Sequence, residues 1–515
     1  MKSDWVRAGR ALPCLMAVAL VVGACGGNSN TNSGGQPAID SSHPTLVVDA
    51  PNSPATLDPG LQYNTDSYQV YRNIFDNLLR RDPSSLKIEP WVADSWKQTT
   101  PTTWEFTIHK GIKFQDGSDL TAADVAFSLN RILDKSFNSP QLANFNTAKQ
   151  ATAGGDIVTI ETFAPSPILL SFLTTLAVVP EKYVKAKGDK QFNLEPMGSG
   201  PYTVKAWIQG SEVQLDANAA YWKGKPPFER VVFRNVPNAS SRVADLQSGK
   251  ADIAFQLSPD DADTVKSAAN LQVLATPTER VGYVAFNVLG NTPTKSVALR
   301  QAIGYAINYD SIIKNLLRGY GKAVNAVLTP LSFGYDKDLP GFKYDPEKAK
   351  QILAANGLQN VSLTFDTSPS YDPNMIQAVQ ADLGKVGIEV KISNTDQATF
   401  LKKIQSPDHT WGSIRFGRWS CSCLDADGTI YPLFHTGTIW SSYSNSAYDK
   451  AVEDARVTTD ENRRMADYRK AFDILQQDVP AVGIYQDYAI YGASKHLQWK
   501  PDPQESFFIR DLRWQ

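Results

Sequence analysis

Apolar residues recur at two alternating periods along most of the chain, and these periods predict a mixed α/β body. Trp104, Phe106 and Ile108 alternate with polar neighbours, which is typical of a half-buried strand. A helix is expected to begin after Thr121, because Thr121 and Asp124 have the spacing of a capping box. Strands that alternate with helices predict βαβ units and mixed α/β layers.

The same alternation continues farther along the chain. Asp345, Pro346 and Glu347 predict a helix start, with a capping side chain, a proline at the first helical position and an acid near the helix dipole. Gly357 suits the position just after that helix. A second helical stripe, a glycine and then a strand pattern follow, formed in turn by Ile376, Val379, Leu383 and Val386, by Gly387, and by Ile388, Val390 and Ile392.

The first 24 residues predict an export signal. Lys2, Arg7 and Arg10 precede the apolar stretch 11–22, which is too short for a stable membrane span. Small residues then precede Cys25, and this pattern resembles a bacterial lipobox, in which the cysteine thiol is lipidated and becomes the mature N-terminus. A plain secretory signal with an incidental cysteine is the alternative.

The segment after Cys25 predicts a flexible tether. Residues 26–44 are rich in Gly, Asn and Ser, so they cannot bury enough apolar area to fold. A flexible chain of this length has an r.m.s. reach of about 24 Å. No later stretch approaches the roughly 18 apolar residues of a membrane-spanning helix. We therefore expect an extracytoplasmic protein that is anchored to the bacterial cell membrane by an N-terminal lipid.

Composition narrows the class of protein without identifying it. The chain has 515 residues, of which 42% are hydrophobic and 20% charged, so it is an ordinary globular chain with a prior of about three domains. The formal net charge of -2 argues against a nucleic-acid partner. Four cysteines are too few for a disulfide scaffold, and five scattered histidines lack metal-ligand spacing. No metal or cofactor is expected.

Signatures of catalysis are missing from the sequence. Residues 319–323 superficially suggest a phosphate-binding loop, but the upstream glycine and the Ser or Thr after the lysine are absent. Neither a G-x-S-x-G nor an H-E-x-x-H pattern occurs. These features favour a binding protein rather than an enzyme, with a secreted lipoprotein hydrolase as the alternative class.

Seven ordered segments resemble the ABC-transporter solute-binding proteins of family 5, the dipeptide, oligopeptide and nickel binders. They lie in the family's order and span nearly all of residues 45–515. The segments are residues 104–131 (WEFTIHKGIKFQDGSDLTAADVAFSLNR), 198–202 (GSGPY), 218–222 (NAAYW), 246–253 (LQSGKADI), 297–308 (VALRQAIGYAIN), 344–350 (YDPEKAK) and 479–481 (VPA).

The resemblance implies a fold and a role. The fold is the two-lobed periplasmic-binding-protein-like α/β fold, type II of the large cluster C kind, whose lobes close by a hinge on a small solute. The protein is then a monomer without catalytic activity that delivers its ligand to ABC permease subunits in the membrane. The expected boundaries are residues 45–285 for lobe I with an inserted subdomain at about 76–200, 286–481 for lobe II, and 482–515 for a tail that returns to lobe I.

Two departures from the family pattern bear on the ligand. In the peptide binders that the chain resembles, an Asp three residues after a strand-ending Gly-Trp pairs with the α-amine of the peptide. Trp419 matches that Trp, but the position of the acid is Ser422. The resembling dipeptide binders also carry an Arg two residues before a Tyr, and here Pro369 precedes Tyr371. Both anchors for free peptide termini are therefore expected to be absent.

Positive charge beside Trp419 suggests a different ligand. Arg418 stands where the family has Gly, and Arg415 lies three residues earlier. Guanidinium groups suit carboxylate or phosphate, so the two predict an anionic ligand unless they are surface strand residues. Asp425 or Asp427 takes the amine-binding role instead if the preceding loop folds differently from the family's. The candidate ligand-binding residues are Tyr371, Arg415, Arg418, Trp419, Ser420, Ser422, Asp425 and Asp427.

Several ligand classes remain open on this basis. A peptide is the default for the family. An opine-like or peptide-like conjugate, or an anionic sugar conjugate, is the sharper alternative, and nickel is a lesser one. Cys421 and Cys423 are expected to form a disulfide in an oxidising exterior, with free thiols or a soft metal ion as the alternatives.

Overall fold

The computed structural model describes residues 43–62 and 64–515. The predicted signal peptide, the lipidation site Cys25 and nearly all of the predicted tether lie outside the described residues. Within the described part of the chain, no helix is both long enough and apolar enough to cross a bilayer.

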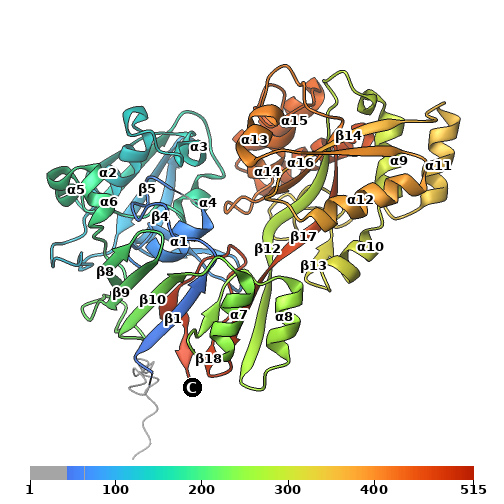
Figure 1. The fold of residues 1–515 in the computed structure, drawn as a ribbon. Coiled ribbons are helices and arrows are strands. Elements are labelled where there is room, and N and C mark those ends of the chain that lie inside the picture. The colour runs from blue at the N-terminus through green and yellow to red at the C-terminus, as the bar shows by residue number, and fades with distance from the viewer. Residues whose placement is uncertain (1–42, 63) are drawn as a thin grey trace, which may run out of the picture. The chain divides into compact units, whose positions relative to one another are not determined.

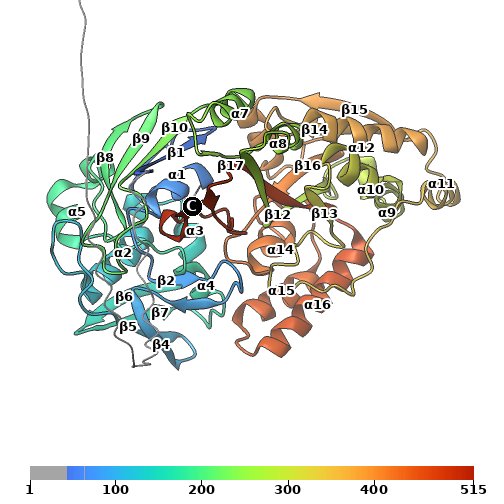
Figure 2. The same ribbon diagram turned by 90° about the horizontal axis from the view of Figure 1, so that it is seen from below.

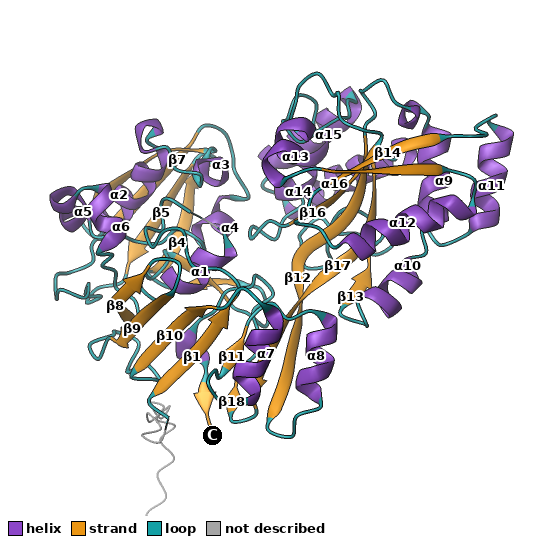
Figure 3. Cartoon of the chain, in the orientation of Figure 1, coloured by secondary structure: helices purple, strands orange, loops and turns teal. Residues whose placement is uncertain are grey.

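A single mixed sheet runs through both halves of this part (Figures 1 and 3). Its strand order is β15-β14-β16-β12-β17-β11-β1-β10-β9-β8, and β13 pairs with β17 off this path. The strands are β1 (Thr45–Ala50), β8 (Tyr202–Ile208), β9 (Glu212–Ala217), β10 (Arg230–Asn235), β11 (Ile253–Ala254), β12 (Leu271–Phe286), β13 (Gly321–Ala323), β14 (Ser362–Thr367), β15 (Glu389–Asn394), β16 (Ile414–Trp419) and β17 (Ala481–Ser494).

Two long antiparallel strands, β12 and β17, connect the halves (Figure 2). β17 pairs with β11 on the side of β1, whereas β12 pairs with β16 only over Val281–Phe286. The half around β1 and β8–β11 is lobe I, and the half around β14–β16 is lobe II. The passage between them lies near the register shift between Pro277 and Val281. The expected boundaries near 285 and 481 fall at the lobe II ends of these two strands.

Lobe I also contains a separate antiparallel sheet, formed by the part of the chain that lies between β1 and β8 in sequence. Its order is β4-β5-β7-β6, and α2 packs on it around the buried Phe106, Ile108, Val125 and Leu129. The strands are β4 (Ala93–Thr100), β5 (Thr103–Ile108), β6 (Ala148–Gly154) and β7 (Ile157–Thr162), and two short ribbons pair β2 (Leu79–Arg81) with β3 (Ile88–Pro90) and β18 (Leu497–Gln498) with β19 (Arg513–Trp514).

Helices cover both sheets (Figure 3). In lobe I they are α1 (Thr65–Tyr71), α2 (Ala122–Leu133), α3 (Leu142–Phe145), α4 (Leu169–Leu173), α5 (Glu181–Lys187), α6 (Asp189–Leu194), α7 (Ala239–Gln247) and α8 (Pro259–Lys266). In lobe II they are α9 (Val297–Ala306), α10 (Tyr309–Ser311), α11 (Pro346–Ala355), α12 (Pro373–Lys385), α13 (Gln397–Ile404), α14 (Asp427–Phe434), α15 (Ser446–Val457) and α16 (Glu461–Asp478).

The local sequence signals lie where the structure needs them. Thr121 and Asp124 form the predicted capping box of α2, because both reciprocal hydrogen bonds are present. Asp345 caps α11 through the Lys348 amide, with Pro346 at its first position. Gly387 has a φ of 86° and separates α12 from β15, as predicted. These confirm the helix boundaries that the sequence predicts.

A close approach of two segments depends on the glycines before β8. A Cβ atom on Gly198 would lie 2.2 Å from the Ile74 carbonyl oxygen, and one on Gly200 would lie 2.7 Å from the same atom. The Gly200 amide donates to that oxygen at 2.8 Å. Only glycine allows this contact, so Gly198 and Gly200 have a structural role.

Candidate functional site

A cleft of about 440 Å³ opens beside β12 and β17, where the lobes meet. Lobe I contributes Asn52 and the start of α1 with Asp66, and lobe II contributes Arg418 at the end of β16. Arg280 on β12 and residues 487–491 on β17 form the floor, and Glu505 of the tail closes one side. Both lobes thus line one solvent-filled space at the strands that join them.

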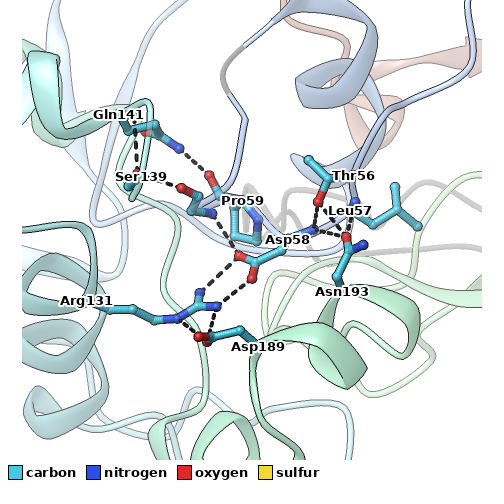
Figure 4. Close-up of polar contacts among 10 residues, drawn as sticks. Thr56, Leu57, Asp58, Pro59, Arg131, Ser139, Gln141, Asp189 and Asn193 are labelled. Atoms are coloured by element: carbon cyan, nitrogen blue, oxygen red, sulfur yellow. Dashed lines mark hydrogen bonds and ion pairs between the residues drawn. The ribbon is translucent and has the colours of Figure 1, made fainter. Parts of the chain in front are cut away.

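The lobe I wall is fixed by a buried ion pair below the segment that follows β1 (Figure 4). Arg131 of α2 donates from Nη1 and Nη2 to the two carboxylate oxygens of Asp58, at 3.0 and 2.5 Å. The Asp58 carboxylate also accepts the Gly60 amide at 2.9 Å. Asp58 is fully buried, and Arg131 continues to the half-exposed Asp189. The segment between Asn52 and α1 is therefore held at its centre.

Each cationic group of the cleft already faces a carboxylate. Arg280 donates from Nη2 to Glu505 Oε1 at 2.9 Å, which links the hinge strand to the tail. Arg418 at the end of β16 forms an ion pair with Asp487 on β17, two strands away in the sheet. The cleft also exposes Asp66, whose pKa is raised by burial. Acidic groups therefore outnumber basic ones on its lining, and the cleft itself offers no free cation.

Glu279 is a buried carboxylic acid beside this cleft. Its side chain lies in the irregular part of β12, and its Oε2 atom has no hydrogen-bond partner. Burial raises the pKa of Glu279 to about 8, and the neighbouring Glu505 carboxylate contributes to the shift. The Arg280 guanidinium opposes the shift only in part.

We expect replacement of Glu279 by glutamine to flatten the pH dependence of stability. The folded-state pKa of Glu279 exceeds the unfolded value of about 4.3, so its stabilising protonation is complete at low pH and is lost as pH rises towards 8. The free energy of unfolding of the parent protein should fall by at most about 1.4 kcal/mol per pH unit from this group. Urea unfolding at pH 5, 6, 7 and 8 measures the slope, with the exposed Glu89→Gln as control. Equal slopes for Glu279→Gln and the parent would contradict the assignment.

The two arginines beside Trp419 do not converge on one ligand. Residues three apart on a strand point to opposite faces, and Arg418 faces the cleft while Arg415 does not. Arg415 is buried, with its guanidinium 5.6 Å from the Tyr283 ring centre and 5.8 Å from that of Trp411. It lines a separate, very small cavity of about 10 Å³ inside lobe II. Only Arg418 of this pair lines the cleft, and its guanidinium is already paired there with Asp487.

The candidate aromatic residues support the lobe II wall. The Trp419 indole Nε1 donates to the Gly428 carbonyl oxygen at 2.8 Å and its ring meets Trp440 edge to face. Tyr371 packs edge to face on Phe400 and Phe416. Burial raises the pKa of Tyr371, so its hydroxyl stays protonated at neutral pH.

Asp425 and Asp427 are engaged inside lobe II. Asp425 accepts both Nη atoms of Arg464 at 2.6 and 2.8 Å and the Tyr468 hydroxyl at 2.8 Å. Arg456 Nε lies 2.9 Å from Asp427 Oδ1, and burial raises the pKa of Asp427 to about 6. Both carboxylates are buried and face these arginines, so neither is placed to receive a ligand amine in the cleft.

The loop after β16 carries a disulfide between Cys421 and Cys423. The two sulfur atoms cover Gly428, where a Cβ atom would lie 2.2 and 2.4 Å from them. Cys423 is fully buried and packs against the core of the inserted subdomain of lobe I. The Ser422 carbonyl oxygen accepts the Gln504 Nε2 amide at 2.5 Å, and Ser420 is half-buried at the base of the loop. Lobe II thus contacts lobe I through this loop.

Sequence reasoning missed the charged groups of the hinge and the tail. Glu279 and Arg280 come from β12, Asp487 from β17 and Glu505 from the tail. One signal was present, because adjacent acidic and basic residues interrupt a strand pattern of otherwise apolar and neutral residues. Among the described residues, no group of His, Cys, Asp and Glu side chains could hold a metal ion.

Comparison with known proteins identifies sequence relatives along nearly the whole chain. Residues 87–441 match the profile of the bacterial extracellular solute-binding proteins, family 5 Middle. The chain is 27% identical to the oligopeptide-binding protein AppA of Bacillus subtilis, over 98% of each chain. It is 26% identical to the dipeptide-binding protein of Escherichia coli, covering 85% of this chain and 88% of that protein.

Solved structures share the fold at lower sequence identity. The ABC transporter substrate-binding protein CtaP of Listeria monocytogenes has a TM-score of 0.84 at 22% identity, covering 93% of this chain and 100% of that one. DppA of Helicobacter pylori, in complex with the peptide STSA, has a TM-score of 0.77 at 24% identity, covering 91% and 98%. Both are periplasmic or substrate-binding proteins by name, and the two-lobed α/β architecture is common to them and to this chain.

Proposed function

Because the chain belongs to the bacterial extracellular solute-binding proteins of family 5, we propose that it captures a peptide-type solute between its lobes and delivers it to the permease of an ABC importer. The observation that carries this proposal is the cleft lined by both lobes beside β12 and β17. Rotation about two shared strands changes the distance between the walls without breaking either lobe's core. The relatives are binding proteins of transporters rather than enzymes.

The free termini of an ordinary short peptide lack obvious partners in this cleft. Ser422 and Pro369 stand where the resembling peptide binders carry charged anchors, and Asp425 is already paired with Arg464. A conjugate without a free α-amine is therefore a second candidate ligand. Either solute makes the protein a receptor, whereas a tethered hydrolase would consume what it binds.

Native mass spectrometry of protein purified from its host tests the receptor function, because a clamp that encloses its solute retains it. Released small molecules are expected to rebind unchanged, one per chain, and to reduce the radius of gyration in small-angle scattering. At a hundredfold excess over the dissociation constant, rebinding should add about 2.7 kcal/mol to the free energy of unfolding. Rebinding without compaction argues against the clamp, and a chemically altered solute supports the hydrolase.

Attachment to the membrane through a lipid on Cys25 is part of the same proposal. Its support is the lipobox-like sequence and the Gly/Asn/Ser-rich segment that follows it. We expect Cys25→Ser to move the protein from the membrane fraction to the soluble fraction of the host. Cell fractionation measures this, with Cys421→Ser/Cys423→Ser as the matched control that leaves the anchor in place. Retention of Cys25→Ser in the membrane fraction would show that another anchor exists.

A further inference from the structure

Lobe I contains a further, small pocket, with a cavity volume of about 30 Å³, which sequence reasoning did not identify. It lies between the β2 ribbon, α1 and the tail, and Thr174 and Thr175 form part of its wall. Four arginines and two aspartates line it, together with aromatic side chains. We call it the arginine pocket, after Arg72, Arg80, Arg81 and Arg510.

Two of its arginines lack a carboxylate partner. Among the described residues, neither Arg72 nor Arg81 has a carboxylate oxygen within ion-pair distance. Arg72 is 7% exposed, hydrogen-bonds Ser506 Oγ and lies 4.1 Å from the centre of the Tyr68 ring. Arg81 donates only to carbonyl oxygens, those of Leu86 and Cys423, at 2.6 and 3.3 Å. Both guanidinium groups are therefore desolvated without a direct ion pair, and the Asp502 carboxylate acts on both only at longer range.

The other two arginines share one carboxylate. Arg80 Nη2 lies 2.6 Å from Asp511 Oδ2, and Arg510 Nε lies 3.6 Å from Asp511 Oδ1. The Arg510 guanidinium also stacks 3.9 Å from the centre of the Trp91 ring. The Nε atoms of Arg72, Arg80 and Arg81 are all buried without a hydrogen-bond partner. Donors are thus in excess on every side of the pocket.

The pocket's own acids do not balance this charge. The Asp76 carboxylate accepts hydrogen bonds from four neutral donors at 2.8–3.0 Å. These are the Trp91 and Trp222 indoles and the Ser199 and Tyr221 hydroxyls. Asp502 is buried, accepts the Gln504 amide at 2.8 Å and has Arg72 and Arg80 nearby, whose charges oppose the rise that burial gives to its pKa. One such carboxylate does not balance four guanidinium groups. Buried guanidinium groups without a paired anion lower the stability of the protein. The planar N–H groups of arginine match the oxygens of a carboxylate or phosphate, so such an anion would neutralise the excess charge.

Lobe II covers this pocket. The loop with the Cys421–Cys423 disulfide contacts two of its lining residues, because Arg81 donates to the Cys423 carbonyl and Gln504 donates to the Ser422 carbonyl. Consecutive residues of the tail face the two spaces, Gln504 the arginine pocket and Glu505 the cleft. The tail therefore lies between the two spaces, and the loop reaches the pocket from lobe II.

We propose that the arginine pocket binds a carboxylate or phosphate group and that docking of the 421–423 loop encloses it. This rests on the proposed receptor function, because the loop belongs to the closing lobe. The anion is either a free ion that stabilises the closed form or the anionic end of the captured solute. Sequence reasoning expected an anionic ligand on account of Arg415 and Arg418, and the geometry moves that expectation to the four arginines of lobe I.

Titration with inorganic phosphate at constant ionic strength tests whether the pocket binds a free anion. Melting temperature and calorimetry are compared for the parent, Arg81→Gln, Arg510→Gln and the control Arg318→Gln, whose side chain is about half exposed and pairs with Asp260 and Asp263. Arg72 is left intact because its burial makes misfolding of a variant the dominant effect. A saturable response that weakens about tenfold in Arg81→Gln or Arg510→Gln, and not in Arg318→Gln, supports a free anion.

Rebinding of the small molecules released from host-purified protein, measured with the same four proteins, tests whether the pocket holds the anionic end of the solute. If phosphate has no effect but rebinding weakens about tenfold in Arg81→Gln and Arg510→Gln, the pocket holds the anionic end of the solute. If neither phosphate nor rebinding responds to these variants while rebinding still compacts the protein, the proposal is overturned and the receptor function stands. If nothing is released or rebound and phosphate has no effect, both are overturned.

Discussion

Replacing Asp58 by alanine is expected to lower the free energy of unfolding by about 3–5 kcal/mol, the largest loss we anticipate in lobe I. The substitution leaves the Arg131 guanidinium with only the half-exposed Asp189 as an ion partner, and it removes the acceptor of the Gly60 amide. A buried charge that loses its principal partner keeps its desolvation cost without the compensating attraction. Denaturant unfolding of the purified protein measures the loss.

The matched control for Asp58→Ala is Asp189→Ala. Asp189 bonds the same guanidinium but has a side chain 54% exposed, so its loss should cost less than about 1 kcal/mol. The segment after β1 carries Asn52 to the cleft, so Asp58→Ala should also weaken solute rebinding while Asp189→Ala does not. Equal destabilisation by the two variants would show that burial does not set the strength of this network.

Replacing Asp425 by asparagine is expected to destabilise lobe II by a similar amount, about 3–5 kcal/mol. Asparagine keeps the shape of the side chain but removes its charge, so the buried Arg464 guanidinium loses the carboxylate that it pairs with directly. Tyr468, which is fully buried, also loses its charged acceptor. Thermal and urea unfolding measure the effect.

Arg469→Gln is the control on the same helix, α16. The Arg469 side chain is 60% exposed in its ion pair with Asp336, so its replacement should lower the free energy of unfolding by less than about 1 kcal/mol. The comparison also decides a question about the ligand. If Asp425→Asn keeps full stability but loses affinity for amine-bearing solutes, Asp425 is a ligand anchor and its pairing with Arg464 is not its role.

These experiments bear on the choice of ligand because the charges inside the protein are arranged in two groups. The interlobe cleft is lined by acids that outnumber its two arginines, each of which is already paired. The arginine pocket has the reverse excess, with four arginines and two aspartates. An anionic group therefore meets an excess of guanidinium donors in the arginine pocket and not in the cleft.

Features of short range could be predicted from the sequence. The capping box at Thr121, the helix start at Asp345 and the change from helix to strand at Gly387 each depend on residues within a few positions of one another. Hydrogen bonds and apolar periodicity of that range act before the chain is folded, so local residue types suffice to specify them. The family could be recognised for a related reason, since its ordered segments include glycines such as Gly198 that the packing requires.

The composition of the candidate site was decided by tertiary structure. Arg464 meets Asp425 across 39 residues, and Arg280 meets Glu505 across 225. No spacing rule connects residues so far apart, because their contact depends on how strands and helices pack. Strand alternation alone places Arg415 and Arg418 on opposite faces, because they lie three residues apart on β16. Which charges are paired, which are buried and which remain for a ligand was set only when β12, β17 and the tail brought the lobes together.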